Sequence, residues 1–134
     1  MNIILDACAL IAFFRNEQGA EIVENYLSDQ KYICMIHAIN LCEVYYDFLR
    51  TGGNTIADTF IEDVESLGLL IRDNLTISFW RQVGSYKASI RRISLADCFA
   101  LTLANRESGI LVTSDRKEFE PIVPLNICAI NFIR

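Results

Sequence analysis

The chain has 134 residues, of which 52% are apolar, and this fits a single domain over residues 1–134 whose core covers both faces of a sheet. Its net charge of −5 argues against a protein that coats nucleic acid, because such proteins neutralise phosphates with Lys and Arg. The longest apolar stretches, such as Ala7 to Phe14, are far shorter than the roughly 20 residues that span a bilayer, and no secretory leader is recognisable. We therefore expect a cytoplasmic protein without a membrane segment.

Short apolar runs alternate along the chain with longer segments whose apolar residues recur every three or four positions. The runs predict strands at Asn2 to Asp6, Lys31 to Ile36, Gly68 to Arg72, Gly109 to Thr113 and Asn126 to Asn131. The longer segments predict amphipathic helices at Glu17 to Asp29, Ala38 to Arg50, Thr55 to Ser66, Ile77 to Ser89 and Ser94 to Glu107. This alternation predicts an α/β fold of three layers, α/β/α, with a central parallel sheet of about five strands.

The five cysteines are an odd number, include no Cys-x-x-Cys pair and mostly lie within apolar runs. This pattern favours reduced, buried thiols over a disulfide framework or a zinc site.

Four acidic residues fall where such a sheet would bring them together. Asp6 follows the first predicted strand and Asp115 follows the fourth, and the carboxyl ends of parallel strands converge on one crevice. Glu43 lies one to two turns into its predicted helix, with Asn40 one turn before it on the same side. Asp97 lies in the first turn of the last long helix, where the helix dipole favours a charged carboxylate. We predict that these four acids share a pocket.

Carboxylates gathered in one pocket repel one another and need a cation to stay charged. Oxygen ligands of this kind suit Mg²⁺ or Mn²⁺, and phosphodiester hydrolysis is the natural use of such a site. Thr113 or Ser114 would orient an acid or the attacking water through a hydroxyl group. The pattern therefore predicts a metal-dependent nuclease.

Each acid also has a purely structural explanation. The segment from Ser94 to Asp97 fits a capping box, Asp115 would cap a short helix over Arg116 to Phe119, and Asp6 would cap a helix that begins near Ala7. Glu43 lies between apolar neighbours, where an unpaired carboxylate is costly unless the helix turns it outward. The combination of the four acids carries the prediction, and no single acid does.

The segments that hold these acids resemble the PIN domain family, and within it the small VapC-like ribonuclease toxins of bacterial toxin–antitoxin pairs. The resemblance covers nearly the whole chain, and its segments occur in the order of the family: Ile3 to Ile11, where a strand ending in Asp precedes a small apolar helix, then Asn40 to Tyr45, Ile93 to Leu101 and Leu111 to Asp115. It implies that Asp6, Glu43, Asp97 and Asp115 bind Mg²⁺ or Mn²⁺ and that the protein cleaves RNA endonucleolytically, leaving a 5′-phosphate. It also implies a homodimer and an antitoxin whose tail occupies a groove and can present a basic residue to the acids.

The chain departs from the family at Ala7 and Cys8, where a Ser, Thr or Asn often follows the first Asp. All four acids are nevertheless intact, so catalysis is expected, and a PIN-like module that binds RNA or protein without catalysis is an alternative that the intact acids disfavour. A phosphoacceptor receiver domain is a weaker one, because it would need a second acid beside Asp6 and a Lys at the end of a later strand. A haloacid-dehalogenase-type phosphatase would need an Asp in the place of Cys8. Metal affinity, and its loss when an acid is removed, separates these classes.

Overall fold

The computed structural model describes all residues, 1–134, and is built on one sheet of five parallel strands. The strands follow the spatial order β3-β2-β1-β4-β5, and all four pairings are parallel. Their bounds are β1 (Asn2–Leu5), β2 (Ile33–His37), β3 (Leu70–Arg72), β4 (Ile110–Thr113) and β5 (Ala129–Phe132). Each strand lies within three residues of its predicted place.

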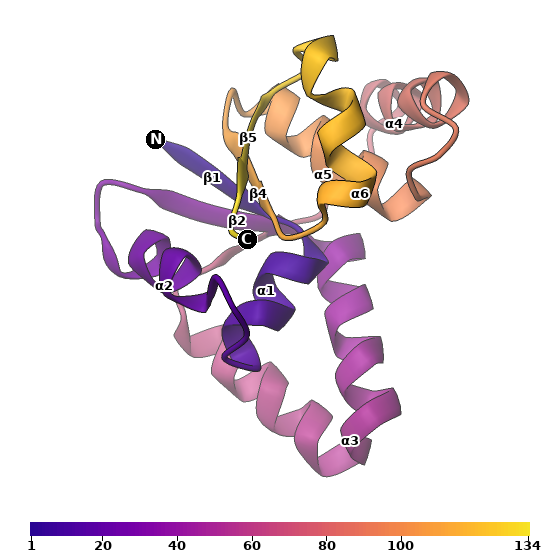
Figure 1. Cartoon of the computed structure of the whole chain (residues 1–134). Coiled ribbons are helices and arrows are strands. Elements are labelled where there is room, and N and C mark those ends of the chain that lie inside the picture. Colours follow the sequence, from indigo (N-terminus) through magenta and orange to yellow (C-terminus); the bar gives the residue numbers. More distant parts are fainter.

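Helices cover both faces of this sheet, so the predicted three-layer α/β/α architecture is confirmed (Figure 1). One layer contains α1 (Ala7–Phe14), α2 (Ala20–Ser28) and α3 (Ala38–Ser66). The other contains α4 (Ile77–Ser89), α5 (Leu95–Arg106), α6 (Arg116–Phe119) and the 3₁₀ helix η1 (Glu120–Leu125). Side chains of β1 alternate between the two cores, since Ile3 and Leu5 pack with the first layer and Ile4 packs with the second.

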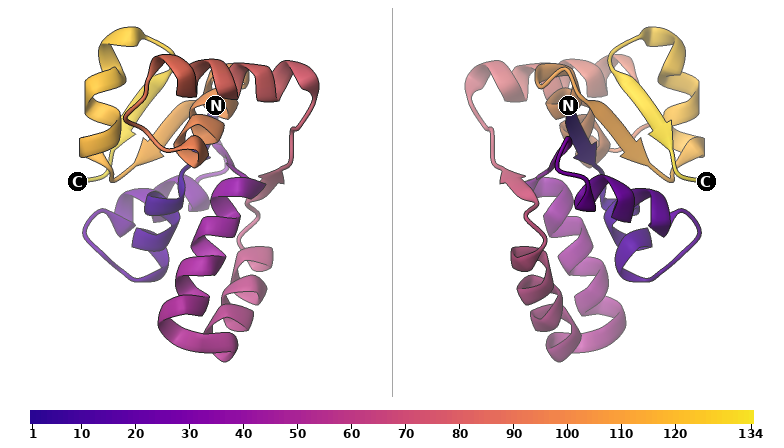
Figure 2. Two further views of the ribbon diagram at one scale, coloured as in Figure 1. Left: turned by 90° about the vertical axis from the view of Figure 1, so that its right-hand side faces the viewer. Right: turned by 90° about the vertical axis from the view of Figure 1, so that its left-hand side faces the viewer.

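The long helix α3 is a V-shaped hairpin with two helical arms (Figure 2). Gly53 interrupts it with φ 80° and ψ −177°, close to the predicted break between the helices at Ala38 to Arg50 and Thr55 to Ser66. Phe48 of the first arm stacks on Phe60 of the second with ring centroids 5.0 Å apart, and Phe14 of α1 packs edge-on against both rings. This aromatic contact joins the two arms to α1.

The strand order reverses between β1 and β4. From β1 the chain crosses to β2 and β3 on one side, and β4 and β5 then fill the other side. In open α/β sheets the crevice outside the carboxyl ends of strands at such a switch point is the usual place for a binding site. The segments after Leu5 and after Thr113 therefore lie at the carboxyl ends of two neighbouring parallel strands.

All five cysteines are free thiols, as predicted. Cys34 and Cys98 are buried and Cys8 and Cys128 are partly buried, but Cys42 is exposed, contrary to the expectation for apolar runs. It lies on the outward side of α3, whose apolar residues line a surface groove as well as the core. No helix has the length and apolar content that a membrane crossing requires.

Candidate active site

Asp6 stands directly between β1 and α1 and is almost fully buried, with 1% of its surface exposed. Its Oδ1 accepts the backbone N–H of Ala9 at 2.8 Å, which confirms that it caps α1. Its Oδ2 is also buried and has no hydrogen-bond partner. Helix capping therefore accounts for one oxygen of this carboxylate and leaves the other unexplained.

The electrostatic surroundings of Asp6 disfavour its charged form. Burial raises its pKa to about 7, the Thr113 hydroxyl and the Ala9 backbone N–H act in the opposite direction, and the charges of Asp97 and Asp115 raise the pKa again. Asp6 forms no salt bridge. A cation at this carboxylate would thus supply an interaction that the protein alone does not.

Asp115 and Thr113 are joined by a local turn at the end of β4. The Thr113 hydroxyl accepts the backbone N–H of Asp115 at 2.9 Å, and Asp115 Oδ1 accepts the backbone N–H of Glu118 at 3.0 Å. The predicted short helix over Arg116 to Phe119 is confirmed as α6, with Asp115 as its N-cap. Ser114 makes no side-chain hydrogen bond to an acid, so of the two predicted hydroxyl groups only that of Thr113 lies next to both Asp6 and Asp115.

Asp97 lies in the first turn of α5 and is partly buried. Its backbone N–H donates to the Ser94 hydroxyl at 3.0 Å, which confirms Ser94 as the N-cap, whereas the return bond from the Ser94 backbone N–H to the Asp97 carboxylate, which a capping box also needs, does not form. Burial raises the pKa of Asp97 to about 6, hydrogen bonding with Ser94 lowers it, and the charges of Glu43, Asp115 and Glu118 raise it further.

Glu43 lies on the first arm of α3 and is an exposed residue as a whole. Its carboxyl group is nevertheless shielded enough that burial raises its pKa, while a hydrogen bond from Asn40 lowers it. The Glu43 side chain therefore lies on the outward side of α3, although its neighbours in the sequence are apolar.

The four predicted acids come from four different elements and influence one another. The charge of Asp97 raises the pKa of Asp6, and the charges of Glu43 and Asp115 raise that of Asp97. Burial raises the pKa of the Cys8 thiol in α1 to about 12, and the charge of each of the four acids raises it as well, since Cys8 lies near them. The four acids are therefore near enough to the start of α1 to act on it electrostatically, and the Cys8 thiol stays protonated.

Glu118 is a fifth acid of this cluster that sequence analysis missed. Its Oε2 is buried without a partner, and its charge raises the pKa of Asp97. Glu118 stands three residues after Asp115 in the sequence, and this spacing indicates only that it belongs to the first turn of a capped helix. The only indication in the sequence was that the predicted short helix over Arg116 to Phe119 would hold Glu118 close to Asp115.

The donor chemistry of this cluster fits a hard divalent cation. Two buried carboxylate oxygens, Asp6 Oδ2 and Glu118 Oε2, lack any partner, and none of the five acids forms a salt bridge. The spacing is wider than a coordination sphere, since no three His, Cys, Asp or Glu side chains are grouped closely enough to hold a metal ion. The residues therefore fit a cation in donor type and electrostatics, and their side chains would have to close around it.

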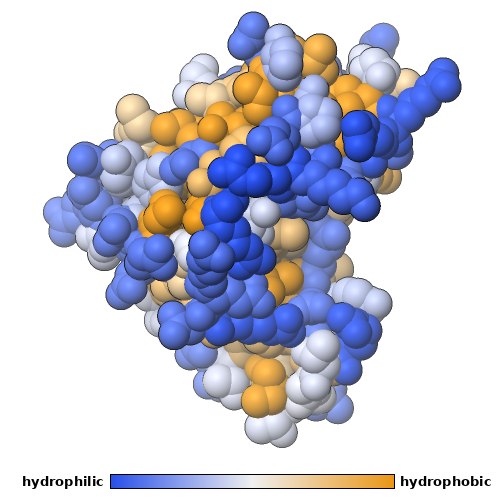
Figure 3. Space-filling model, viewed as in Figure 1, coloured by the Kyte–Doolittle hydropathy of each residue, from blue (hydrophilic) through white to orange (hydrophobic).

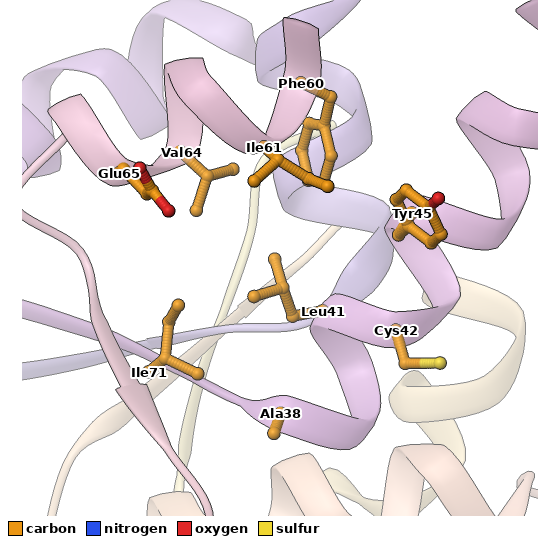
Figure 4. Close-up of a pocket in the computed structure, with 9 residues that line it drawn as sticks. All are labelled: Ala38, Leu41, Cys42, Tyr45, Phe60, Ile61, Val64, Glu65 and Ile71. Carbon is orange, nitrogen blue, oxygen red and sulfur yellow. The ribbon is translucent and has the colours of Figure 1, made fainter. Parts of the chain in front are cut away.

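An apolar groove of about 370 Å³ lies between the arms of α3 and the edge strand β3, and none of the four predicted acids lines it. Leu41 of the first arm faces Phe60, Ile61 and Val64 of the second across this space, and Ile71 closes one side (Figure 4). Ala38, Cys42, Tyr45 and Glu65 complete its lining. Because Cys42 is adjacent to Glu43 in the chain, the groove and the acids share the first arm of α3.

A family model described as PIN domain matches residues 3–122, a range that includes all four predicted acids and Glu118. The chain belongs to the PIN domain family. A search of curated protein sequences finds no match.

Solved structures show that the fold of this PIN domain is shared with proteins from bacterial toxin–antitoxin complexes. A chain of DNA-bound VapBC from Salmonella typhimurium has a TM-score of 0.75 at 19% identity and covers 100% of this chain and 99% of its own. A chain of Rickettsia felis VapBC2, bound to a promoter DNA fragment, has a TM-score of 0.74 at 16% identity, with 98% of each chain covered. A chain of a toxin–antitoxin complex from Klebsiella pneumoniae has a TM-score of 0.74 at 14% identity, with 98% of each chain covered.

This PIN domain carries no hydroxyl at the two positions after Asp6, where Ala7 is buried and Cys8 is partly buried. The hydroxyl that lies next to Asp6 comes instead from Thr113, at the end of the neighbouring strand β4. Hydroxyl contact with the first acid is therefore retained from a different element of the fold.

Proposed function

We propose that this PIN domain is a Mg²⁺- or Mn²⁺-dependent endoribonuclease and the toxin of a toxin–antitoxin pair. The observation that supports the proposal is the mutual electrostatic influence of Asp6, Glu43, Asp97 and Asp115, which belong to four different parts of the fold. A structural role alone does not require four mutually repelling carboxylates in one place, and two of them keep raised pKa values of about 7 and about 6.

In this proposal Asp6, Glu43, Asp97 and Asp115 hold the cation, and Glu118 adds negative charge beside it. A bound Mg²⁺ or Mn²⁺ would activate water and neutralise charge on the phosphate of the substrate. The protein's own contribution is positioning. The Ala9 N–H holds Asp6 Oδ1, the Glu118 N–H holds Asp115 Oδ1, and the Thr113 hydroxyl lies between the two acids.

The partner in this proposal is an antitoxin protein. It is supported by the fold shared with chains of toxin–antitoxin complexes and by the apolar groove between the arms of α3. A segment bound in this groove would contact Cys42, the residue before Glu43, and in this proposal it presents a basic side chain to the acids. The homodimer and the cytoplasmic location stay predictions of the sequence.

One observation favours the alternative, a PIN module that binds RNA or protein without catalysis. The acids are not grouped closely enough to hold a metal ion as they stand. The two functions differ in whether the protein cuts RNA when a divalent cation is supplied.

Cleavage assays test the proposal. We expect purified protein to cut single-stranded or structured RNA with Mg²⁺ or Mn²⁺ and not with EDTA, in a panel that also contains DNA. Asp6→Asn and Asp97→Asn should each reduce the rate by roughly 100-fold or more, since removal of a residue beside a metal ligand already costs 10–100-fold. Asp58→Asn, an exposed acid on the second arm of α3, serves as the control and should keep full activity.

Cutting that persists in EDTA, or in both active-site variants, would contradict the proposal. Metal binding without any cutting would favour the non-catalytic module.

A further inference from the structure

The start of α3 is unusually well anchored. Its N-cap is His37, a buried residue whose Nδ1 accepts the Ile39 backbone N–H at 3.1 Å and whose Nε2 lies 3.0 Å from the Asn74 carbonyl oxygen. The imidazole also stacks on Phe79, with ring centroids 5.4 Å apart. The first turn of α3 is therefore held against the layer that contains α4.

Asn40 lies in this first turn and is completely buried, with none of its surface exposed. Its Nδ2 donates to the carbonyl oxygen of Ala96 at 3.0 Å, a contact between residues 56 positions apart. Ala96 directly precedes Asp97 in the first turn of α5. A single side chain thus joins the helix that carries Glu43 to the backbone that carries Asp97.

Glu43 lies one turn further along α3, on the same side of the helix as Asn40. An amide nitrogen has two N–H donors, and because only Nδ2 can face a carbonyl oxygen, the contact with Ala96 fixes the orientation of the group.

A purely structural role explains this residue poorly. The Oδ1 of Asn40 is buried without a hydrogen-bond partner, which carries a desolvation cost. An apolar side chain of similar volume, such as Leu, would fill the same space between α3 and α5 without that cost. A buried and only partly satisfied amide between two acid-bearing helices is the arrangement expected of a group that orients metal ligands.

We propose that Asn40 is a positioning residue that sets the separation of Glu43 and Asp97, and so the affinity of the acid cluster for a divalent cation. The inference rests on the proposed function, because it assumes that the cluster binds a cation. It adds a contact through which the two helices carrying these acids are coupled.

A calorimetric titration of the purified protein with Mn²⁺, in the absence of RNA, tests this role. We expect Asn40→Leu and Asn40→Ala to bind Mn²⁺ roughly 10–100-fold more weakly than the wild type, as is typical when a group that orients metal ligands is removed. The matched control is Thr102→Val. Thr102 is also fully buried, and its hydroxyl donates to the Cys98 carbonyl oxygen at 2.7 Å inside α5.

Urea unfolding of the same samples separates affinity from stability. Thr102→Val should lose stability while its Mn²⁺ affinity stays within about twofold of the wild type, because its hydrogen bond lies within one helix. Asn40→Ala introduces no extra volume and so provides a folded variant if Asn40→Leu does not fold.

Three outcomes would count against the inference, and they can be told apart. If the wild type takes up no Mn²⁺, the proposed cation site fails and the role of Asn40 fails with it. If the wild type binds Mn²⁺ and a folded Asn40 variant binds it equally well, only the role of Asn40 is overturned. If Thr102→Val weakens Mn²⁺ binding as much as the Asn40 variants, loss of stability explains the effect and Asn40 has no specific role.

Discussion

Individual acids of this PIN domain combine a structural role with a place in the candidate site. Asp6 caps α1 and Asp115 caps α6, each through Oδ1. The capping hydrogen bond holds each carboxyl group in one orientation before any ligand binds. The cost is visible at Asp6, whose second oxygen is buried without a partner.

Replacing Asp6 with Asn should stabilise the metal-free protein at neutral pH. The folded-state pKa of Asp6 is about 7, above the ordinary value of 3.8, so the folded protein keeps a proton that the unfolded chain releases. Stability is therefore lost as pH rises from about 4 to about 7. An Asn side chain can still accept the Ala9 N–H and carries no charge. We expect a gain on the order of 2 kcal/mol in EDTA at about pH 8, and little gain at about pH 4.

Urea unfolding at the two pH values measures this effect, with Asp58→Asn as the exposed control. Equal or lower stability of Asp6→Asn at the higher pH would show that the buried carboxylate is already compensated in the folded protein.

At the scale of elements, the hairpin of α3 shapes both the site and the groove. Its first arm carries Glu43, and the space between its arms is the apolar groove (Figure 4). The bend depends on Gly53, whose backbone has φ 80° and ψ −177°, a region that residues with a Cβ rarely enter. The angle between the arms therefore depends on one glycine and on the aromatic contact of Phe48 with Phe60.

Gly53→Ala should destabilise the protein by about 1–3 kcal/mol. A Cβ at this position meets nothing within 4 Å, so the cost comes from the backbone alone. Gly84→Ala is a matched control, because its Cβ also meets nothing within 4 Å and Gly84 is exposed inside α4. That control should gain about 0.5–1 kcal/mol through helix propensity. Thermal unfolding compares the two variants, and equal effects would mean that the bend does not need glycine.

At the scale of the whole molecule, the parallel sheet brings distant segments to one crevice while its two faces are covered by separate cores. On the face shown in Figure 3, hydrophilic residues form a band across the middle of the molecule with apolar patches on either side. The acids come from four elements, so the folded state alone gathers them. A cation that binds all four acids therefore binds only the folded state and stabilises it against unfolding.

Mn²⁺ should therefore raise the melting temperature of the wild type at neutral pH. Binding to the folded state alone adds about 2.7 kcal/mol when free Mn²⁺ is about 100 times its Kd, which corresponds to several degrees for a domain of this size. Asp6→Asn should show a much smaller rise, although it is more stable without metal. Scanning calorimetry with Mn²⁺ and with EDTA provides the measurement, and an identical rise in both proteins would mean that Mn²⁺ acts elsewhere.

Local sequence patterns were sufficient to predict the order of the elements, their parallel arrangement, and the caps at Asp6 and Asp115. These features depend on the two-residue period of strands, the 3.6-residue period of helices and capping within three residues. The break at Gly53 was predictable for the same reason, since glycine pairs interrupt helices locally.

Other features depend on contacts between distant parts of the chain. The bond from Asn40 to Ala96 and the position of Glu118 beside Asp97 follow from how α3, α5 and α6 pack. The outward turn of Glu43 and the groove between the arms of α3 follow from the rotation of that helix. No local period encodes the rotation of one helix against another, because packing of side chains from distant segments sets it. The acids can thus be chosen from the sequence, whereas the groups that orient them emerge only when the layers are assembled.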